Sequence, residues 1–153
     1  LYTEDGTAGK GLEAAAEMWS KVLQVAVTPR AVTEDELESA LRGGGYVLAA
    51  VSWTAMANDA ESFLSPFRSH GEDNVTGYSN SAFDTLLTII DSASDPAARL
   101  ACLHDAESLL LEDCAAAPVY FSGSGWELRG SLTGVCRDAR GWFSFELVRQ
   151  REA

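Results

Sequence analysis

The sequence has little positive charge for its length. Its 153 residues include 11 Lys and Arg against 23 Asp and Glu, which gives a net charge of −12 at pH 7. Proteins that bind nucleic acid present a basic stripe or patch to the phosphates, and this sequence has none. We therefore expect no nucleic-acid partner. The simplest role of the carboxylates is solubility, and a cationic ligand remains open.

Long apolar runs and a signal peptide are also missing. No apolar run approaches the roughly 20 residues of a membrane-spanning helix, and no secretory leader is visible. The chain starts at Leu1 rather than Met, and its first residues already read as structured. We therefore expect a fragment of a longer protein. Residues 1–153 are predicted to form one α/β domain, because the length suits a single hydrophobic core.

Cysteine is scarce, and its three occurrences define no framework. Cys102 and Cys114 fall on one predicted helix, where 12 residues separate them by roughly 18 Å, too far for a disulfide. Either thiol could pair with Cys136, so the disulfide state stays open. There is no CxxC motif and no Cys/His cluster with the spacing of metal ligands. We expect neither a metal nor a cofactor.

Catalytic motifs are absent as well. The sequence contains no GxSxG, no Walker loop and no HExxH. The run of glycines at 43–45 follows a helix and precedes a strand, so it reads as a connecting turn rather than a phosphate loop. His70 and His104 have neither a nucleophile nor a metal ligand beside them in sequence. The chain is therefore predicted not to be an enzyme.

The first third of the chain alternates between strand and helix patterns. Residues 1–3, 25–32 and 46–53 read as strands, and the last of these is apolar enough to be buried on both faces. An apolar helical stripe runs from Leu12 to Leu23, and a second helix begins at a Thr33/Glu36 capping box with Gly43 suited to its end. This order predicts a mixed, mostly parallel sheet flanked by helices.

The second half reads as more helical. Residues 61–67 form a short helical piece, a helix follows a second apparent capping box at Ser81 and Asp84, and a long helix starts at Asp95 and Pro96. Its predicted stripe consists of Leu103, Ala106, Leu109 and Leu110. Residues 117–121, 126–130 and 141–148 read as further strands.

In parallel sheets, ligands gather beyond the carboxyl ends of the strands, so the segment after residue 53 is the place to look for a site. Trp53 belongs either to the core or to a cleft, where its indole N–H could serve a ligand. Asp59 and Glu61 either cap the short helix or meet a ligand amine. Asn74, Val75 and Thr76 match a glycosylation triplet, a pattern that is common by chance.

The ordered combination of segments resembles a known family. Trp53, Asp59 and a Ser-Phe-Leu run are followed by GYSNSAFDTLL and DPAARLACLHDAESLLLEDCAAAPVYF. Together these are similar to the bacterial extracytoplasmic solute-binding proteins of peptide ABC transporters, family 5. The resemblance covers nearly the whole chain, because the order of helices and strands leading to Trp53 also fits. In the second half the matching positions are Tyr78, Ser79, Asn80, Phe83, Asp84, Leu86, Leu87, Arg99, Ala106, Glu107, Pro118 and Tyr120.

The resemblance implies a C-terminal lobe of the type II periplasmic-binding-protein fold. Such a protein encloses an extended peptide between two lobes and delivers it to a membrane permease. The implied partners are a peptide or other small solute, the remaining lobe and the permease. The implied location is extracytoplasmic, either periplasmic or lipid-anchored through a segment outside this chain. The isolated lobe is expected to bind peptide weakly or not at all.

Four residues after the third predicted strand are the expected ligand-binding set: Trp53, Thr54, Met56 and Asp59. The resemblance also shows a departure, because family members commonly carry an aspartate at the position of Met56, where it pairs with the ligand's α-amino group. A proline of the family is likewise replaced by Ala60. A thioether cannot balance an ammonium, so anchoring of a free peptide amine is in doubt. Asp59 or Glu61 would have to substitute, or the ligand has no amine there, or the lobe has drifted from transport.

Other hypotheses remain. The same fold serves as the ligand-sensing domain of transcriptional regulators, and the sequence upstream of Leu1 would discriminate between the two roles. The solute could also be a nickel chelate, haem or a sugar. An enzyme such as a hydrolase is disfavoured by the lack of any nucleophile–base or metal arrangement.

Overall fold

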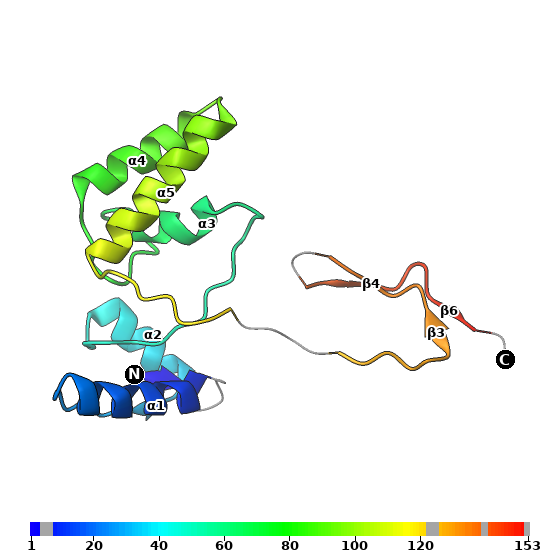
Figure 1. Ribbon diagram of the computed structural model, residues 1–153, viewed down its shortest axis with the longest axis horizontal. Helices are drawn as coiled ribbons and strands as arrows, with labels where there is room; N and C mark the ends of the chain where they lie inside the picture. The colour runs from blue at the N-terminus through cyan, green and yellow to red at the C-terminus, as the bar shows by residue number, and fades with distance from the viewer. Residues whose placement is uncertain (4–7, 122–125, 139–140, 152–153) are drawn as a thin grey trace.

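The computed structural model describes residues 1–3, 8–121, 126–138 and 141–151. Figure 1 shows three parts along the chain: an N-terminal unit (residues 1–53), a helical unit (residues 61–113) and a C-terminal arm (residues 126–151). Within the described residues, no helix combines the length and the apolar character needed to cross a membrane.

The N-terminal unit alternates strand and helix, as predicted. Its elements are β1 (Tyr2–Thr3), α1 (Ala8–Val22), β2 (Ala31–Val32) and α2 (Glu34–Gly43). The capping box is confirmed: the Thr33 side chain accepts from the Glu36 amide, and the Glu36 carboxylate accepts from the Thr33 amide. The helix ends one residue later than predicted, because Gly44 rather than Gly43 adopts the left-handed conformation, with φ of 65°.

The parallel arrangement of this unit is present in outline. β1 pairs with β2 in parallel. On its other side, the Leu1 amino group donates to the Leu48 carbonyl at 2.7 Å, and the Ala50 amide donates to the Leu1 carbonyl at 2.9 Å. This alternation of donor and acceptor is that of a parallel bridge. The first segment therefore lies between β2 and residues 48–50.

The predicted wide, mostly parallel sheet is not seen, and the fold class requires this correction. Among the described residues, each sheet has two strands of two residues. The predicted strands 46–53 and 117–121 are irregular, and Val47 and Val51 are exposed. A strand persists only where neighbours take up its backbone N–H and C=O groups, and within the described ranges residues 46–53 have such a neighbour only near Leu1.

The helical unit contains the core. It consists of α3 (Glu61–Leu64), the 3-10 turn η1 (Ser65–Phe67), α4 (Ser81–Ser92) and α5 (Pro96–Glu112). The predicted apolar stripes are confirmed, because α4 and α5 bury them against each other with Leu64 of α3. The buried cluster is Leu64, Phe83, Leu87, Ile90, Leu103, Ala106 and Leu110. Burial of this kind, at roughly 25 cal/mol per Å² of apolar surface, stabilises the pair.

The helix starts are set by side-chain caps. Asp95 caps α5 ahead of Pro96, as predicted. For α4 the predicted Ser81/Asp84 capping box is wrong. The N-cap is Asn80, whose Oδ1 accepts from the Ala82 amide at 2.9 Å. The Asp84 carboxylate instead accepts from the Ser69 amide at 3.0 Å and ties the preceding loop to the helix.

The C-terminal arm is a pair of small antiparallel ladders. Its strands are β3 (Leu132–Thr133), β4 (Cys136–Arg137), β5 (Phe143–Ser144) and β6 (Arg149–Gln150), with β3 paired to β6 and β4 to β5. Figure 1 shows this arm extending away from the helices. Gly134, with φ of 83°, lets the chain pass the Leu147 carbonyl, which any side chain at that position would strike. All three cysteines are free thiols.

Candidate functional site

The predicted ligand-binding residues lie on one connection, the Trp53 loop (residues 53–61), which joins the N-terminal unit to α3. Trp53, Thr54 and Met56 are exposed, and Met56 projects almost fully into solvent with 94% of its surface accessible. Trp53 is not part of the buried core of this chain, because 48% of its surface is open. Asp59 differs from these three residues because it is only partly exposed.

The Trp53 loop is folded back on the start of α3 by its own hydrogen bonds. The Trp53 indole Nε1–H donates to the Ser62 carbonyl at 3.0 Å, and the Ser62 hydroxyl donates to the Ala57 carbonyl at 3.5 Å. The indole N–H is thus used within the chain, which leaves the ring face as the part of Trp53 that a ligand could meet. Aromatic faces of this kind supply apolar contact area with a fixed orientation.

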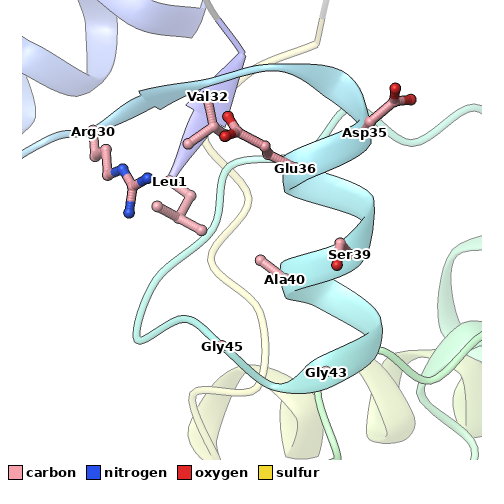
Figure 2. A pocket seen from close by; sticks show the side chains of 9 residues that line it. All are labelled: Leu1, Arg30, Val32, Asp35, Glu36, Ser39, Ala40, Gly43 and Gly45. Carbon is pink, nitrogen blue, oxygen red and sulfur yellow. The ribbon is translucent and has the colours of Figure 1, made fainter.

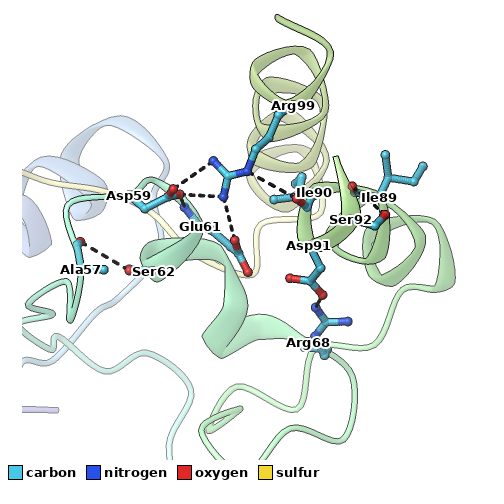
Figure 3. A network of polar contacts seen from close by, with 10 residues as sticks. All are labelled: Ala57, Asp59, Glu61, Ser62, Arg68, Ile89, Ile90, Asp91, Ser92 and Arg99. Atoms are coloured by element: carbon cyan, nitrogen blue, oxygen red, sulfur yellow. Dashed lines mark hydrogen bonds and ion pairs between the residues drawn. The ribbon is translucent and has the colours of Figure 1, made fainter. Parts of the chain in front are cut away.

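Arg99 of α5 joins the acidic end of the loop to the helical unit (Figure 3). Its Nη1 lies 2.9 Å from Asp59 Oδ2, and its Nη2 donates to Asp59 Oδ1 at 3.1 Å and to Glu61 Oε2 at 2.8 Å. Its Nε donates to the Ile90 carbonyl at 3.3 Å, at the last turn of α4. One guanidinium therefore contacts the loop, α3 and α4 from its place on α5.

Asp59 also takes up the first amide of α3, because its Oδ1 accepts from the Glu61 amide at 2.9 Å, although the N-cap position itself is Ala60. The capping interpretation of Asp59 is therefore supported, and the ion pair with Arg99 is added to it. Arg99 was recognised in the sequence only as part of the family pattern. No periodicity or spacing connects it with carboxylates 38 and 40 residues earlier.

The two carboxylates differ in electrostatic setting. The hydrogen bond from Arg99, together with the Glu61 amide, lowers the pKa of Asp59. Burial and the nearby Asp91 carboxylate raise the pKa of Glu61 and outweigh the opposing effect of Arg99. Asp91 is itself paired with Arg68 at 2.8 Å. The two arginines therefore flank a pair of neighbouring carboxylates, Glu61 and Asp91, of which Glu61 pairs with Arg99 and Asp91 with Arg68.

The fully exposed side chains of the Trp53 loop are uncharged. Its two acidic groups, on Asp59 and Glu61, are both engaged by Arg99. The side chains that remain exposed include the Met56 thioether, the Thr54 hydroxyl, the Trp53 indole ring and the Asn58 amide. Such side chains make contacts of shape, apolar area and neutral hydrogen bonding, and none of them carries a counter-charge for an ammonium group.

Side-chain hydrogen bonds hold the Gly-Tyr-Ser-Asn segment in place before α4. Asn74 Nδ2 donates to the Tyr78 carbonyl at 2.8 Å and to the Arg68 carbonyl at 3.1 Å. This nitrogen is the atom that a glycan would modify, and here it is engaged by carbonyls of the chain itself. Tyr78 and Asn80 both donate to Asp113 Oδ2, at 2.7 and 2.8 Å.

A separate hollow of 540 Å³ lies between α2 and the β1–β2 pair (Figure 2). The side chains that line it do not include any predicted ligand-binding residue. Leu1, Arg30, Val32, Asp35, Glu36, Ser39, Ala40, Gly43 and Gly45 surround it. Glu36 is committed to the capping box, so the polar wall of this hollow is largely the start of α2. In the part of the chain that the structure describes, no three His, Cys, Asp or Glu side chains are grouped to hold a metal.

Comparisons with known proteins identify relatives of known kind. No protein-family model matches the chain. It is 30% identical over 141 residues to the oligopeptide-binding protein OppA of Bacillus subtilis. The aligned segment covers 92% of this chain and 26% of that protein. It is 32% identical over 108 residues to the probable deoxycholate-binding periplasmic protein YgiS of Escherichia coli. This alignment covers 71% of this chain and 20% of that protein.

The fold is similar to that of a solved peptide receptor. The structure of the pheromone receptor PrgZ matches with a TM-score of 0.79 and 24% sequence identity, over 99% of this chain and 29% of that one. The aligned segments cover 20% and 26% of the lengths of these two sequence relatives, so the chain spans about a quarter of the proteins it matches.

Proposed function

Because this chain belongs to the family of extracytoplasmic peptide-binding proteins of ABC transporters, we propose that it forms one ligand-binding lobe of such a protein. The chain corresponds to about a quarter of its relatives, as in the 26% coverage of OppA. In this proposal it captures a ligand together with a second lobe, outside the cytoplasm, and presents it to a membrane permease. The reaction is binding alone, and no bond is made or broken.

The exposed side chains of Trp53, Thr54 and Met56 form the ligand wall in this proposal. The observation that carries it is the exposure of two large apolar side chains, Trp53 at 48% and Met56 at 94%, on a loop that is held by internal hydrogen bonds. Apolar side chains exposed on a fixed loop are typical of interaction surfaces. Asp59 supports the wall through Arg99 rather than contacting ligand.

The finer fold follows the same proposal. Residues 48–50 of the segment 46–53 bond to Leu1, and Val47 is 95% exposed. We place this segment in a wider, mostly parallel sheet that is completed by chain outside residues 1–153. The added strands would take up the backbone groups that this segment leaves open, since buried sheets satisfy both edges.

A second ligand class is favoured by one observation. No carboxylate of the Trp53 loop is free for an ammonium, because Arg99 engages both Asp59 and Glu61. A ligand without a free amine at this wall would fit better than a zwitterionic peptide. The relative named as probably deoxycholate-binding gives such a ligand, an amphipathic steroid carboxylate, as an alternative to a peptide.

Titration calorimetry on the complete two-lobed protein tests these proposals. The probes are the pentapeptide AFAFA with a free amine, the same peptide N-acetylated, and deoxycholate. We expect the acetylated peptide to bind at least as tightly as the free one. Clear preference for the free amine would contradict the neutral wall, binding of deoxycholate alone would favour the second class, and no binding by any probe would refute both. The chain 1–153 alone is expected to bind each probe weakly or not at all.

A further inference from the structure

We propose that Arg99 is the positioning residue of the ligand wall, and that it sets both the place and the charge of the Trp53 loop. This inference rests on the proposed function for its consequence in binding, although its structural part stands on contacts within the chain. Arg99 is 46 residues from Trp53 in sequence and lies on α5. It touches no ligand in this proposal and acts through the loop.

The geometry of Arg99 is that of a fork with three separate partners. Both terminal nitrogens lie within 3.1 Å of Asp59 oxygens, one of them also reaches Glu61 at 2.8 Å, and Nε reaches the Ile90 carbonyl. Guanidinium groups present rigid, planar donors that match carboxylates in pairs. A lysine ammonium on a flexible stem could satisfy one of these partners well, but its donors do not span all three.

The position of Arg99 makes this fork a joint between two parts of the molecule. In the described part of the chain, it makes both ion pairs that connect the Trp53 loop and the start of α3 with α5. Its side chain is 25% exposed, so solvent screens these pairs less than those on open helix faces. Trp53 is tied in turn to Ser62 of α3. Movement of the α3 start away from α5 would therefore carry the ligand wall with it.

The charge consequence follows from the same contacts. Without the guanidinium, Asp59 and Glu61 would leave two uncompensated carboxylates beside the wall, near the Asp91 carboxylate that already raises the pKa of Glu61. Like charges at this separation repel and draw in water or cations. Arg99 thus offsets one of these two negative charges as well as holding the wall in place, and its loss would change which ligands the wall accepts.

Substitution of Arg99 by Met in the complete protein tests the inference, with Arg99→Lys as the conservative variant. The matched control is Arg68→Met, which removes the Arg68–Asp91 ion pair of 2.8 Å in the same helical unit but leaves every Arg99 contact in place. Two readouts are compared: hydrogen exchange of the amides in residues 57–62, and the affinity for N-acetylated AFAFA and for deoxycholate.

For Arg99→Met we expect exchange in residues 57–62 to be about tenfold faster and affinity about tenfold weaker, since charge-assisted hydrogen bonds are lost. Arg99→Lys should lie between Arg99→Met and wild type, and Arg68→Met should leave both quantities near wild type. Equal effects of Arg99→Met and Arg68→Met on both readouts would overturn the inference. If Arg99→Met does not fold, Arg99→Lys decides: exchange at the wild-type rate would also overturn it.

The two proposals fail separately. If wild-type protein binds neither probe, the proposed function is refuted, while the exchange rates of residues 57–62 still decide whether Arg99 holds the loop. If wild type binds and Arg99→Met binds equally well with unchanged exchange, the proposed function survives and the role of Arg99 is refuted.

Discussion

The hydrogen bond from Tyr78 to Asp113 gives a prediction that depends on pH. The Tyr78 hydroxyl donates to Asp113 Oδ2 at 2.7 Å, and its ring packs edge-to-face against Phe83 with centroids 5.4 Å apart. Tyr78→Phe removes the hydroxyl and keeps the ring contact. Hydrogen bonds to charged groups contribute about 1.5–3 kcal/mol, and the accessible carboxylate reduces this, so we expect a loss of about 1 kcal/mol at pH 7.

The pH dependence follows from the phenol. Burial, followed by the Asp113 carboxylate, raises the pKa of Tyr78 to about 12 from an ordinary value of 10.0. A raised pKa in the folded state means that the stabilisation is complete below pH 10 and is lost as the pH rises from 10 to 12. The advantage of wild type over Tyr78→Phe should therefore be constant between pH 7 and 9 and should shrink above pH 10.

Urea denaturation of the chain at a series of pH values measures this difference. The matched control is Tyr120→Phe, because Tyr120 is 57% exposed in an irregular segment and its substitution should change stability little. Equal stability of wild type and Tyr78→Phe at pH 7 would refute the hydrogen bond as a stabilising contact. A stability difference that stays constant from pH 10 to 12 would refute the link with ionisation of Tyr78.

Three further predictions concern the core, the loop and the wall. Leu87→Ala empties a site that is fully buried between α4 and α5, so it should cost about 3–5 kcal/mol in guanidinium denaturation; a cost below 1 kcal/mol would show that the core is loosely packed. Asp59→Asn should destabilise the chain at pH 7, and because the pKa of Asp59 is lowered below 3.8, the gap should close as the pH falls below that value. A gap that persists well below this range would contradict the ion pair. Met56→Asp in the complete protein should raise affinity for free-amine peptides in calorimetry, and unchanged affinity would remove the support for missing amine anchoring.

The helices were predictable because their signals are local. Apolar spacing placed Phe83, Leu87 and Ile90 on one face, and Asp95 with Pro96 marked the start of α5. The start of α4 was misplaced by one residue for a physical reason. Asn80 and Ser81 are both good N-caps, and the acidic residue three positions after Ser81 completed an apparent box. Asp84 instead bonds to Ser69, a contact across a loop that the local pattern does not reveal.

The strands were less predictable because a sheet is a non-local structure. Residues 46–53 have the apolar composition of a buried strand, yet among the described residues their backbone pairs only with Leu1. Their composition predicts a segment that needs neighbouring strands, but it does not identify those strands. The candidate site divided in the same way. Sequence position and the family resemblance singled out the residues after Trp53, whereas the Arg99 contacts required two segments 40 residues apart to be brought together.

The arrangement of the Trp53 loop bears on how a chain with a net charge of −12 would treat a cationic ligand. The excess charge acts over roughly 8 Å at physiological ionic strength, so it draws cations toward the chain as a whole. At the loop itself, however, Arg99 engages the two carboxylates, and the side chains that remain open are uncharged. The net charge therefore attracts a cationic ligand toward the chain, but the open side chains of the loop do not hold it by charge. Because the loop is already held by hydrogen bonds from Trp53 and Arg99, little of its own freedom is lost on binding, so contact area at a neutral wall can still yield affinity.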